Sequence, residues 1–87
     1  MVLSMVRVKL CGKLKRQVVK LSLHYPSFRD LLNYISRDDV ELDEVRKLVG
    51  KVNIEFKGDL RIYVRKTPYW VKVADYCLVL TCKRGRV

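Results

Sequence analysis

Residues 77–82 read Cys-Leu-Val-Leu-Thr-Cys, and this stretch decides the fold because both of its alternate sets of side chains are mainly apolar. Successive side chains of a strand point to opposite faces of the sheet. The two sets here are Leu78, Leu80 and Cys82 on one face and Cys77, Val79 and Thr81 on the other. A strand that is apolar on both faces is typically central and covered. We therefore predict that this segment is a central strand of the sheet.

Four other segments alternate apolar and polar residues with a period of two, which indicates strands with one buried face. They are residues 6–10, 19–23, 52–56 and 60–64. The first two are predicted to form a hairpin through a turn at Gly12-Lys13, and the last two are joined by a tight turn at Gly58-Asp59. Thr67-Pro68 ends the 60–64 strand, and residues 70–73 are candidates for a short edge strand.

Two segments between these strands have helical spacing. Ser27 is a suitable N-cap, Asp30 complements the helix dipole, and Phe28, Leu31, Leu32 and Ile35 follow with the spacing of one buried stripe. This predicts a helix over Ser27–Arg37. A second, shorter helix is predicted from the spacing of Leu42, Val45, Leu48 and Val49, ending at the C-cap Gly50.

The order of elements predicts a single α+β domain over residues 1–87, with helices on one face of a sheet and a loose tail at 83–87. The predicted core follows from the two periodicities. It consists of Val8, Leu21, Leu32, Ile35, Ile54, Ile62 and Leu80.

Three segments resemble those of the ubiquitin-like, or β-grasp, superfamily. Residues 6–14 (VRVKLCGKL) are similar to the first strand and turn of the small sulfur carriers of molybdopterin and thiamine synthesis, and residues 27–32 (SFRDLL) to their helix opening. Residues 71–80 (VKVADYCLVL) are similar to their last loop and strand. The resemblance implies a mixed sheet of four or five strands, with the first and last strands adjacent and parallel. An all-antiparallel sheet of two hairpins is the competing arrangement.

The end of the chain bears on what that family does. Ubiquitin-like carriers are activated at a C-terminal Gly-Gly, whereas this sequence has a single Gly85 followed by Arg86 and Val87. The resemblance thus implies an alternative function as a sulfur carrier or protein modifier, in which trimming exposes Gly85 to an activating enzyme. The missing second glycine argues against this chemistry, and a shared fold is not a shared function.

Composition points away from enzymes and cofactors. The three cysteines, Cys11, Cys77 and Cys82, have no C-x-x-C spacing, which favours ordinary thiols in a reducing cytoplasm over a disulfide framework or a metal site. His24, the lone histidine, is interpreted as a strand-end residue rather than a base or ligand. No apolar run is long enough for a membrane span. We expect a non-enzymatic protein without cofactor, metal or small-molecule substrate.

Charge gives the strongest functional signal. The net charge is +10, with seven bases and no acid in residues 1–29 and seven bases against one acid in residues 60–87. Residues 30–59 hold five bases and eight acids. Since the basic segments read as strands and the acidic one as mostly helix, the sheet should carry a basic face. Such a face attracts an acidic partner, most commonly RNA or DNA.

The face is predicted to contain the residues that alternate with the core positions. They are Arg7, Lys9, Lys20, Arg61, Tyr63, Arg65 and Lys72. Tyr63 lies between two arginines, and Tyr69 and Trp70 follow closely, so rings that stack on bases alternate with charges that bind phosphates, as single-stranded nucleic acids require. The preferred function is RNA or single-stranded DNA binding. An acidic protein surface is the alternative partner, and a merely solvated face is the simplest interpretation of the charges.

Overall fold

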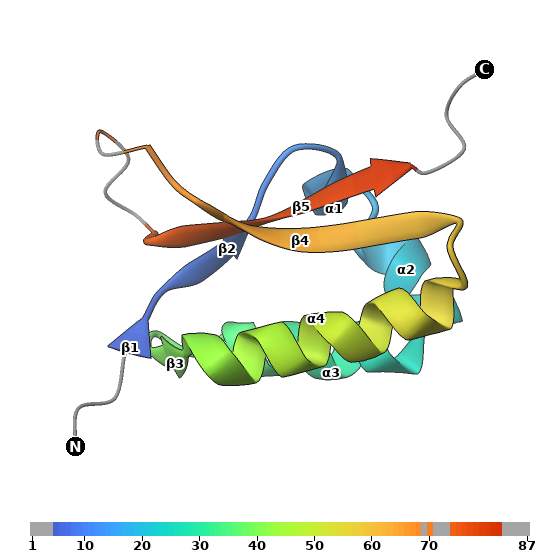
Figure 1. The fold of residues 1–87 in the computed structure, drawn as a ribbon, viewed down its shortest axis with the longest axis horizontal. Coiled ribbons are helices and arrows are strands. Elements are labelled where there is room, and N and C mark those ends of the chain that lie inside the picture. The colour runs from blue at the N-terminus through green and yellow to red at the C-terminus, as the bar shows by residue number, and fades with distance from the viewer. Residues whose placement is uncertain (1–4, 69, 71–73, 83–87) are drawn as a thin grey trace.

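The computed structural model describes residues 5–68, 70 and 74–82, which form a sheet packed on a layer of helices (Figure 1). The sheet has three strands, in the order β2 (Val8–Leu10), β5 (Tyr76–Cys82), β4 (Leu60–Lys66). β5 runs parallel to β2 and antiparallel to β4. The prediction of a central β5 is confirmed, as is the parallel pairing of the first and last segments, and an all-antiparallel sheet is wrong.

Four helices connect β2 to β4. They are α1 (Lys13–Arg16), α2 (Val18–His24), α3 (Pro26–Ile35) and α4 (Leu42–Phe56). α3 and α4 lie side by side across one face of the sheet, and α2 lies at the end of this layer (Figure 1). A two-residue antiparallel ladder joins β1 (Met5–Val6) to β3 (Val40–Glu41). The predicted α+β class is confirmed.

The strand predicted over residues 19–23, and with it the N-terminal hairpin, is wrong because these residues belong to α2. The buried side chains follow the helical period: Leu14, Leu21 and Phe28 are each seven residues apart and are fully or almost fully buried. Val19 and Leu23, which the strand pattern placed beside Leu21, are instead 72% and 73% exposed. A period of two and a period of 3.6 both fit so short an apolar run.

The strand predicted over residues 52–56 is also wrong, because α4 continues through Gly50 to Phe56. Val45, Val49, Val52 and Phe56 form one buried helical stripe that crosses the glycine without interruption. Gly50 is therefore inside the helix and is not its C-cap. The helix ends at Lys57, which has a left-handed φ of 56°, and Gly58 follows with φ 89°.

The predicted helix over Ser27–Arg37 is present with different ends, Pro26 and Ile35. Pro26 occupies the first turn, where the missing N–H costs nothing, and Ser27 is not the N-cap. The Ser27 backbone N–H instead donates to the Glu55 carboxylate on α4, at 3.2 Å. This contact ties the start of α3 to the end of α4.

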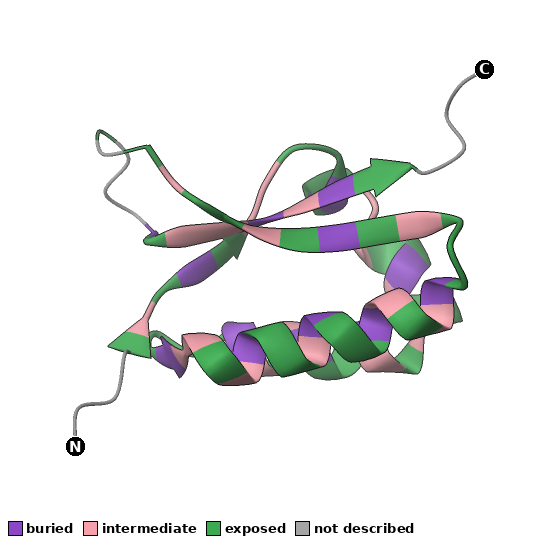
Figure 2. Cartoon of the chain, in the orientation of Figure 1, coloured by how far each residue is buried: buried purple, intermediate pink, exposed green. Residues whose placement is uncertain are grey.

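The core lies between the sheet and the helices, where the buried faces of the two layers meet (Figure 2). The predicted core residues Val8, Leu21, Ile35, Ile62 and Leu80 are buried. Leu32 is only half-buried, since Leu31 and Phe28 form the innermost part of the α3 stripe. Ile54 is wrong as a core residue, with 76% of its surface exposed, because the α4 spacing turns it to solvent.

One side chain closes part of the sheet edge. The Asn53 amide on α4 donates to the Ile62 carbonyl at 2.9 Å and accepts from the Ile62 N–H at 2.8 Å. These two bonds take the place of a neighbouring strand at the middle of β4. They satisfy backbone groups that an edge strand otherwise leaves open to pairing with another chain.

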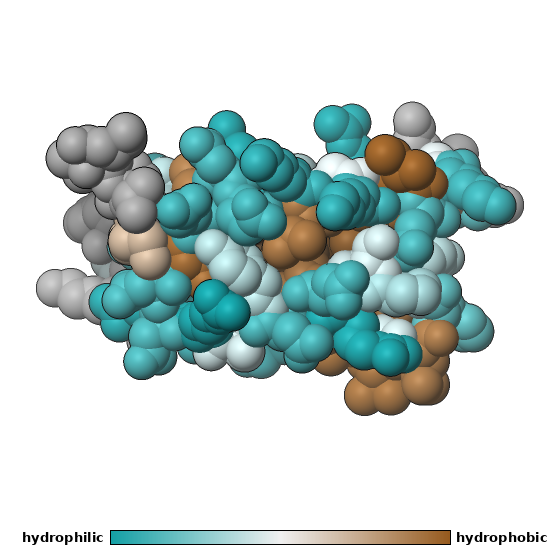
Figure 3. All heavy atoms as spheres, turned by 90° about the horizontal axis from the view of Figure 1, so that it is seen from below, coloured by the Kyte–Doolittle hydropathy of each residue, from teal (hydrophilic) through white to brown (hydrophobic). Residues whose placement is uncertain are grey.

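Seen from the side of α3 and α4, the surface of the helix layer is mainly hydrophilic, with some apolar atoms between the hydrophilic ones and a larger apolar group at one end (lower right in Figure 3). The exposed large apolar side chains of α2, the helix at that end of the molecule in Figure 1, are Val19 and Leu23.

Candidate nucleic-acid interface

The sheet face that points away from the helices carries the odd-numbered residues of each strand. Val8, Ile62, Leu78 and Leu80 are buried against the helices, so their neighbours along each strand must point to the opposite side. We call this surface the outer basic face and define it by Lys9 on β2 and Arg61, Tyr63 and Arg65 on β4. All four side chains are exposed.

Strand register places these residues in rows across the sheet. Lys9 and Arg65 both pair with Cys77, one from each side of β5. Tyr63 pairs with Val79, and Arg61 pairs with Thr81. β5 lies between β2, which carries Lys9, and β4, which carries Arg61 and Arg65, and adjacent strands are about 4.8 Å apart. To the outer face of the sheet, β5 itself contributes only the uncharged residues Cys77, Val79 and Thr81. Positive charge thus flanks a small neutral strip.

Tyr63 gives the outer basic face an aromatic surface between two guanidinium groups. Its side chain is 38% exposed, and Arg61 and Arg65 lie two residues away on either side along the same face of β4. Trp70, in the connection between β4 and β5, is 68% exposed. An exposed ring offers a stacking surface, and flanking arginines offer charge and planar hydrogen-bond donors.

A groove between α4 and the edge of β4 extends this basic surface. Its volume is about 400 Å³, and Arg46 and Gly50 of α4 line it together with Arg61 and Tyr63 of β4. Arg46 was not predicted as a site residue, because its proximity to the sheet arises only once α4 crosses beneath β4. Gly50 leaves the helix wall open, since a Cβ there meets nothing within 4 Å.

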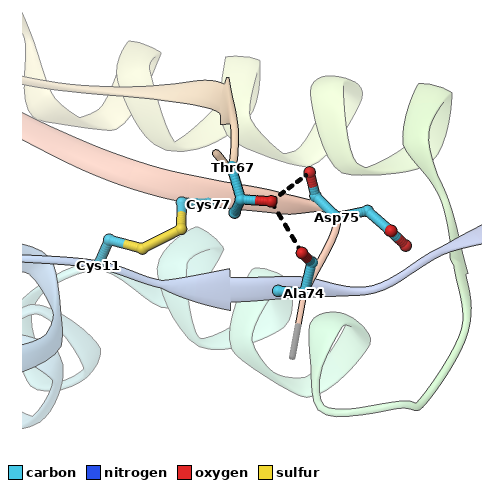
Figure 4. The surroundings of a disulfide bond; sticks show 5 residues. All are labelled: Cys11, Thr67, Ala74, Asp75 and Cys77. Carbon is cyan, nitrogen blue, oxygen red and sulfur yellow. Dashed lines mark hydrogen bonds between the residues drawn. A yellow bond between two sulfur atoms is a disulfide. The ribbon is translucent and has the colours of Figure 1, made fainter. Parts of the chain in front are cut away.

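Between β5 and the end of β2, a disulfide joins Cys77 to Cys11, with their Cα atoms 5.8 Å apart (Figure 4). The expectation of ordinary thiols is therefore wrong for these two cysteines. Lys9 pairs with Cys77 in the parallel ladder, so Cys11, two residues after Lys9, lies on the same face of the sheet as Cys77. The Cys11 N–H donates to the Leu78 carbonyl at 3.1 Å. Sequence separation of 66 residues concealed this proximity.

The disulfide also forms part of a hollow of about 580 Å³, which Lys9 and Lys15 border. The Thr67 hydroxyl lies 2.8 Å from the Ala74 carbonyl and 3.1 Å from that of Asp75, closing the base of the β4–β5 connection (Figure 4). The Asp75 carboxylate accepts the Arg7 backbone N–H at 3.0 Å. This acid is thus engaged with the backbone at the margin of the outer basic face.

Not every predicted site residue belongs to this face. Lys20 was placed there in error, because it lies on α2 and not on a strand. Arg7 is exposed between β1 and β2 and flanks the face. Lys72, Tyr69 and most of the predicted 70–73 edge strand lie outside the described residues, as does Gly85 of the alternative carrier tail.

No helix in the described part of the chain is long and apolar enough to cross a membrane. Within the same residues, no three His, Cys, Asp or Glu side chains are grouped so that they could hold a metal ion.

Comparison of the whole chain with models of known protein families, with curated proteins and with solved structures finds no match.

Proposed function

We propose that the protein binds single-stranded nucleic acid, RNA or DNA, through the outer basic face. The observation that carries this proposal is the exposed Tyr63 ring between Arg61 and Arg65 on one face of β4. Base stacking on such a ring is tolerant of sequence, and the flanking cations hold the phosphate backbone. The protein is a binding module in this proposal, with no catalytic role for the face.

Charge distribution supports a polyanion over a neutral partner. The net charge of +10 is carried mainly by the segments that flank residues 30–59 in sequence. Of their described bases, Lys9, Arg61, Arg65 and Lys66 lie on strands of the sheet, whereas the bases of residues 13–29 lie on α1, α2 and α3. The eight acids of residues 30–59 lie in the segment of α3 and α4, behind the sheet. A polyanion is therefore attracted to the bases of the sheet and repelled by the acids of residues 30–59, which increases the association rate at the outer basic face.

The proposal predicts a salt-dependent affinity. If Arg7, Lys9, Arg61 and Arg65 neutralise about four phosphates, the affinity for a single strand should fall ~50-fold between 50 and 200 mM salt, because condensed counterions are released. Fluorescence anisotropy with labelled single-stranded RNA and DNA oligonucleotides measures this slope. The double variant Arg61→Glu/Arg65→Glu should lose most of the binding and retain the fold, since both side chains are exposed.

The matched control is Lys47→Glu/Lys51→Glu, which changes the net charge equally on the exposed surface of α4. Arg46 is unsuitable as a control because it lines the groove beside Arg61. Equal losses in the two double variants, or binding that does not respond to salt, would mean that the outer basic face is only a solvated surface. Binding of acidic proteins but not of oligonucleotides would favour the alternative partner.

A distant relationship with ubiquitin-like proteins remains part of the proposal. The adjacent, parallel β2 and β5 support it, whereas α1 and α2 stand where the resemblance implied a second strand. Carrier chemistry at Gly85 is the second candidate function. Mass spectrometry of the protein from its own cells tests it, because a mature end or a thiocarboxylate at Gly85 would favour a carrier.

A further inference from the structure

A second basic site lies away from the outer basic face, at the end of the molecule where α2 meets the sheet. It is a pocket of about 350 Å³ on the helix side of β4 and β5. We call it the end pocket and define it by three groups: the polar residues of α1 and α2, the apolar side chains behind them, and Cys82 at the end of β5. Its volume is within the range of small-molecule sites, roughly 300–1,000 Å³.

The polar wall of the end pocket is one continuous stripe. Lys13, Gln17, Lys20 and His24 all line it, and their spacing of four, three and four residues is that of one helical face. The helical course persists across the junction of α1 and α2, because the Gln17 N–H donates to the Lys13 carbonyl at 3.1 Å and the Leu21 N–H donates to the Gln17 carbonyl at 2.9 Å. Lys20 thus has a defined place in a pocket.

The opposite wall is apolar, with one ring. Leu21, Leu60 and Leu80 contribute aliphatic surface, and Tyr25 contributes an aromatic side chain held edge-on against Phe56, at 4.7 Å between ring centroids. Because Tyr25 is packed against the buried Phe56, its ring is fixed before any ligand enters. The pocket therefore combines an ordered ring and aliphatic surface with two ammonium groups.

No acidic side chain is among the described residues that line the end pocket. Two acids, Glu55 and Asp59, line a neighbouring groove that shares His24 and Tyr25 with the end pocket. Glu55 already accepts the Ser27 N–H. The pocket is therefore complementary to an anion that carries a flat, apolar body, since a simple anion would leave the leucines and Tyr25 without contacts.

We propose that the end pocket binds a nucleoside monophosphate, with the phosphate at Lys13 and Lys20 and the base against Tyr25 and the leucines. Gln17 and His24 add hydrogen-bonding groups along the polar wall. The same chemistry is presented by a free nucleotide and by the 5′-phosphorylated end of a strand. The inference goes beyond the proposed function, because it requires neither the outer basic face nor a long strand.

Cys82 supplies a direct readout. It lines the end pocket, its side chain is exposed, and the other two cysteines are joined in the disulfide, so Cys82 alone should react with iodoacetamide under non-reducing conditions. Adenosine 5′-monophosphate at ten times its dissociation constant should slow this reaction about tenfold, in proportion to occupancy. Adenosine and inorganic phosphate, each at the same concentration, should slow it far less, because each fills only part of the pocket.

Charge-reversal variants inside and outside the end pocket test whether protection depends on the pocket lysines or only on the net charge of the protein. Lys13→Glu/Lys20→Glu should abolish the protection by the nucleotide, Lys13→Arg/Lys20→Arg should retain it, and the matched reversal Lys47→Glu/Lys51→Glu should leave it unchanged. Arg61→Glu/Arg65→Glu should also leave it unchanged, so that failure of the proposed function and failure of this inference are distinguishable. Calorimetric titration with the nucleotide gives the dissociation constant for each variant.

The source of the nucleotide is decided by oligonucleotides with and without a 5′ phosphate. Protection by the phosphorylated oligonucleotide alone supports a strand end, and protection by the mononucleotide supports a free ligand. The inference is overturned if neither protects Cys82 and neither binds in a way that depends on Lys13 and Lys20. It is equally overturned if inorganic phosphate protects as well as the nucleotide, because the site would then be selective only for charge.

Discussion

Tyr63 is the residue on which the stacking part of the proposed interface depends. Its ring is exposed on the outer basic face between Arg61 and Arg65. Tyr63→Ala should weaken binding of single-stranded oligonucleotides by about 1–3 kcal/mol, whereas Tyr63→Phe should retain most of the affinity because the ring is kept. The salt slope should hardly change in either variant, since stacking releases few ions. Anisotropy titrations over a salt series measure both quantities. A loss in Tyr63→Phe equal to that in Tyr63→Ala would point to the hydroxyl group and away from stacking.

Substitutions at Ile62 and Ile54 together test whether residues 52–56 are helical. Ile62 is fully buried on β4, whereas Ile54 is 76% exposed on α4. Ile62→Ala should lower the free energy of unfolding by about 2–5 kcal/mol because it opens a cavity in the core. Ile54→Ala should change it by less than about 0.5 kcal/mol. Urea unfolding followed by circular dichroism measures both. A large loss for Ile54→Ala would restore the strand that the sequence pattern suggested.

At the scale of elements, Gly50 distinguishes one long helix from a short helix followed by a strand. In α4 it occupies an ordinary helical position, and an added Cβ meets nothing within 4 Å. Gly50→Ala should therefore stabilise the protein by about 0.5–1 kcal/mol, because alanine loses less conformational entropy in a helix. Gly12→Ala is the contrasting variant. With φ at +58°, it should destabilise by about 1–3 kcal/mol. Thermal melts compare the two, and destabilisation by Gly50→Ala would indicate a left-handed cap at that position.

The sheet could be predicted from sequence better than the helices, and the reason is physical. β4 and β5 are seven residues long, which is about two turns of a competing helix, and β4 is also bounded by the turn residues Gly58-Asp59 and Thr67-Pro68. Residues 18–24 are equally long, so length does not distinguish the two cases. The positions that decide it for this segment, Leu14 and Phe28, lie outside the run. Gly50 misled for a different reason, because a glycine after a helical stripe is more often a cap than an interior residue.

The residues of the candidate sites also divide into those that the sequence could predict and those that it could not. Lys9, Arg61, Tyr63 and Arg65 could be placed on one face because alternation along a strand determines which way a side chain points. Arg46, Lys20 and the Cys11–Cys77 disulfide could not, since each depends on contacts between elements distant in the sequence. Lys20 in particular was predicted on the sheet, but it lines the end pocket because its segment is helical.

At the scale of the whole molecule, the disulfide is the strongest single constraint on the unfolded chain. It links residues 66 positions apart and so encloses most of the described chain in one loop. Cys11→Ser/Cys77→Ser should lower the free energy of unfolding by about 2–4 kcal/mol, because the open chain regains the entropy that the loop removed. Addition of a reductant to the unmodified protein should give the same loss. Cys82→Ser is the control and should unfold at the unmodified midpoint. A double variant with an unchanged midpoint in guanidinium chloride would show that the cross-link contributes nothing to stability.

The central position of β5 also determines when the protein can fold as it is synthesised. A ribosome releases β2, all four helices and β4 before Tyr76–Cys82, at roughly 5–20 residues per second. Until β5 emerges, the nascent chain contains amphipathic helices, the short β1 and β3, and the strands β2 and β4, which lack the neighbour they share. Formation of the core therefore waits for a single late step, in which β5 enters between strands made much earlier. A chain truncated before residue 76 should therefore have exposed apolar faces, which chaperones and proteases recognise.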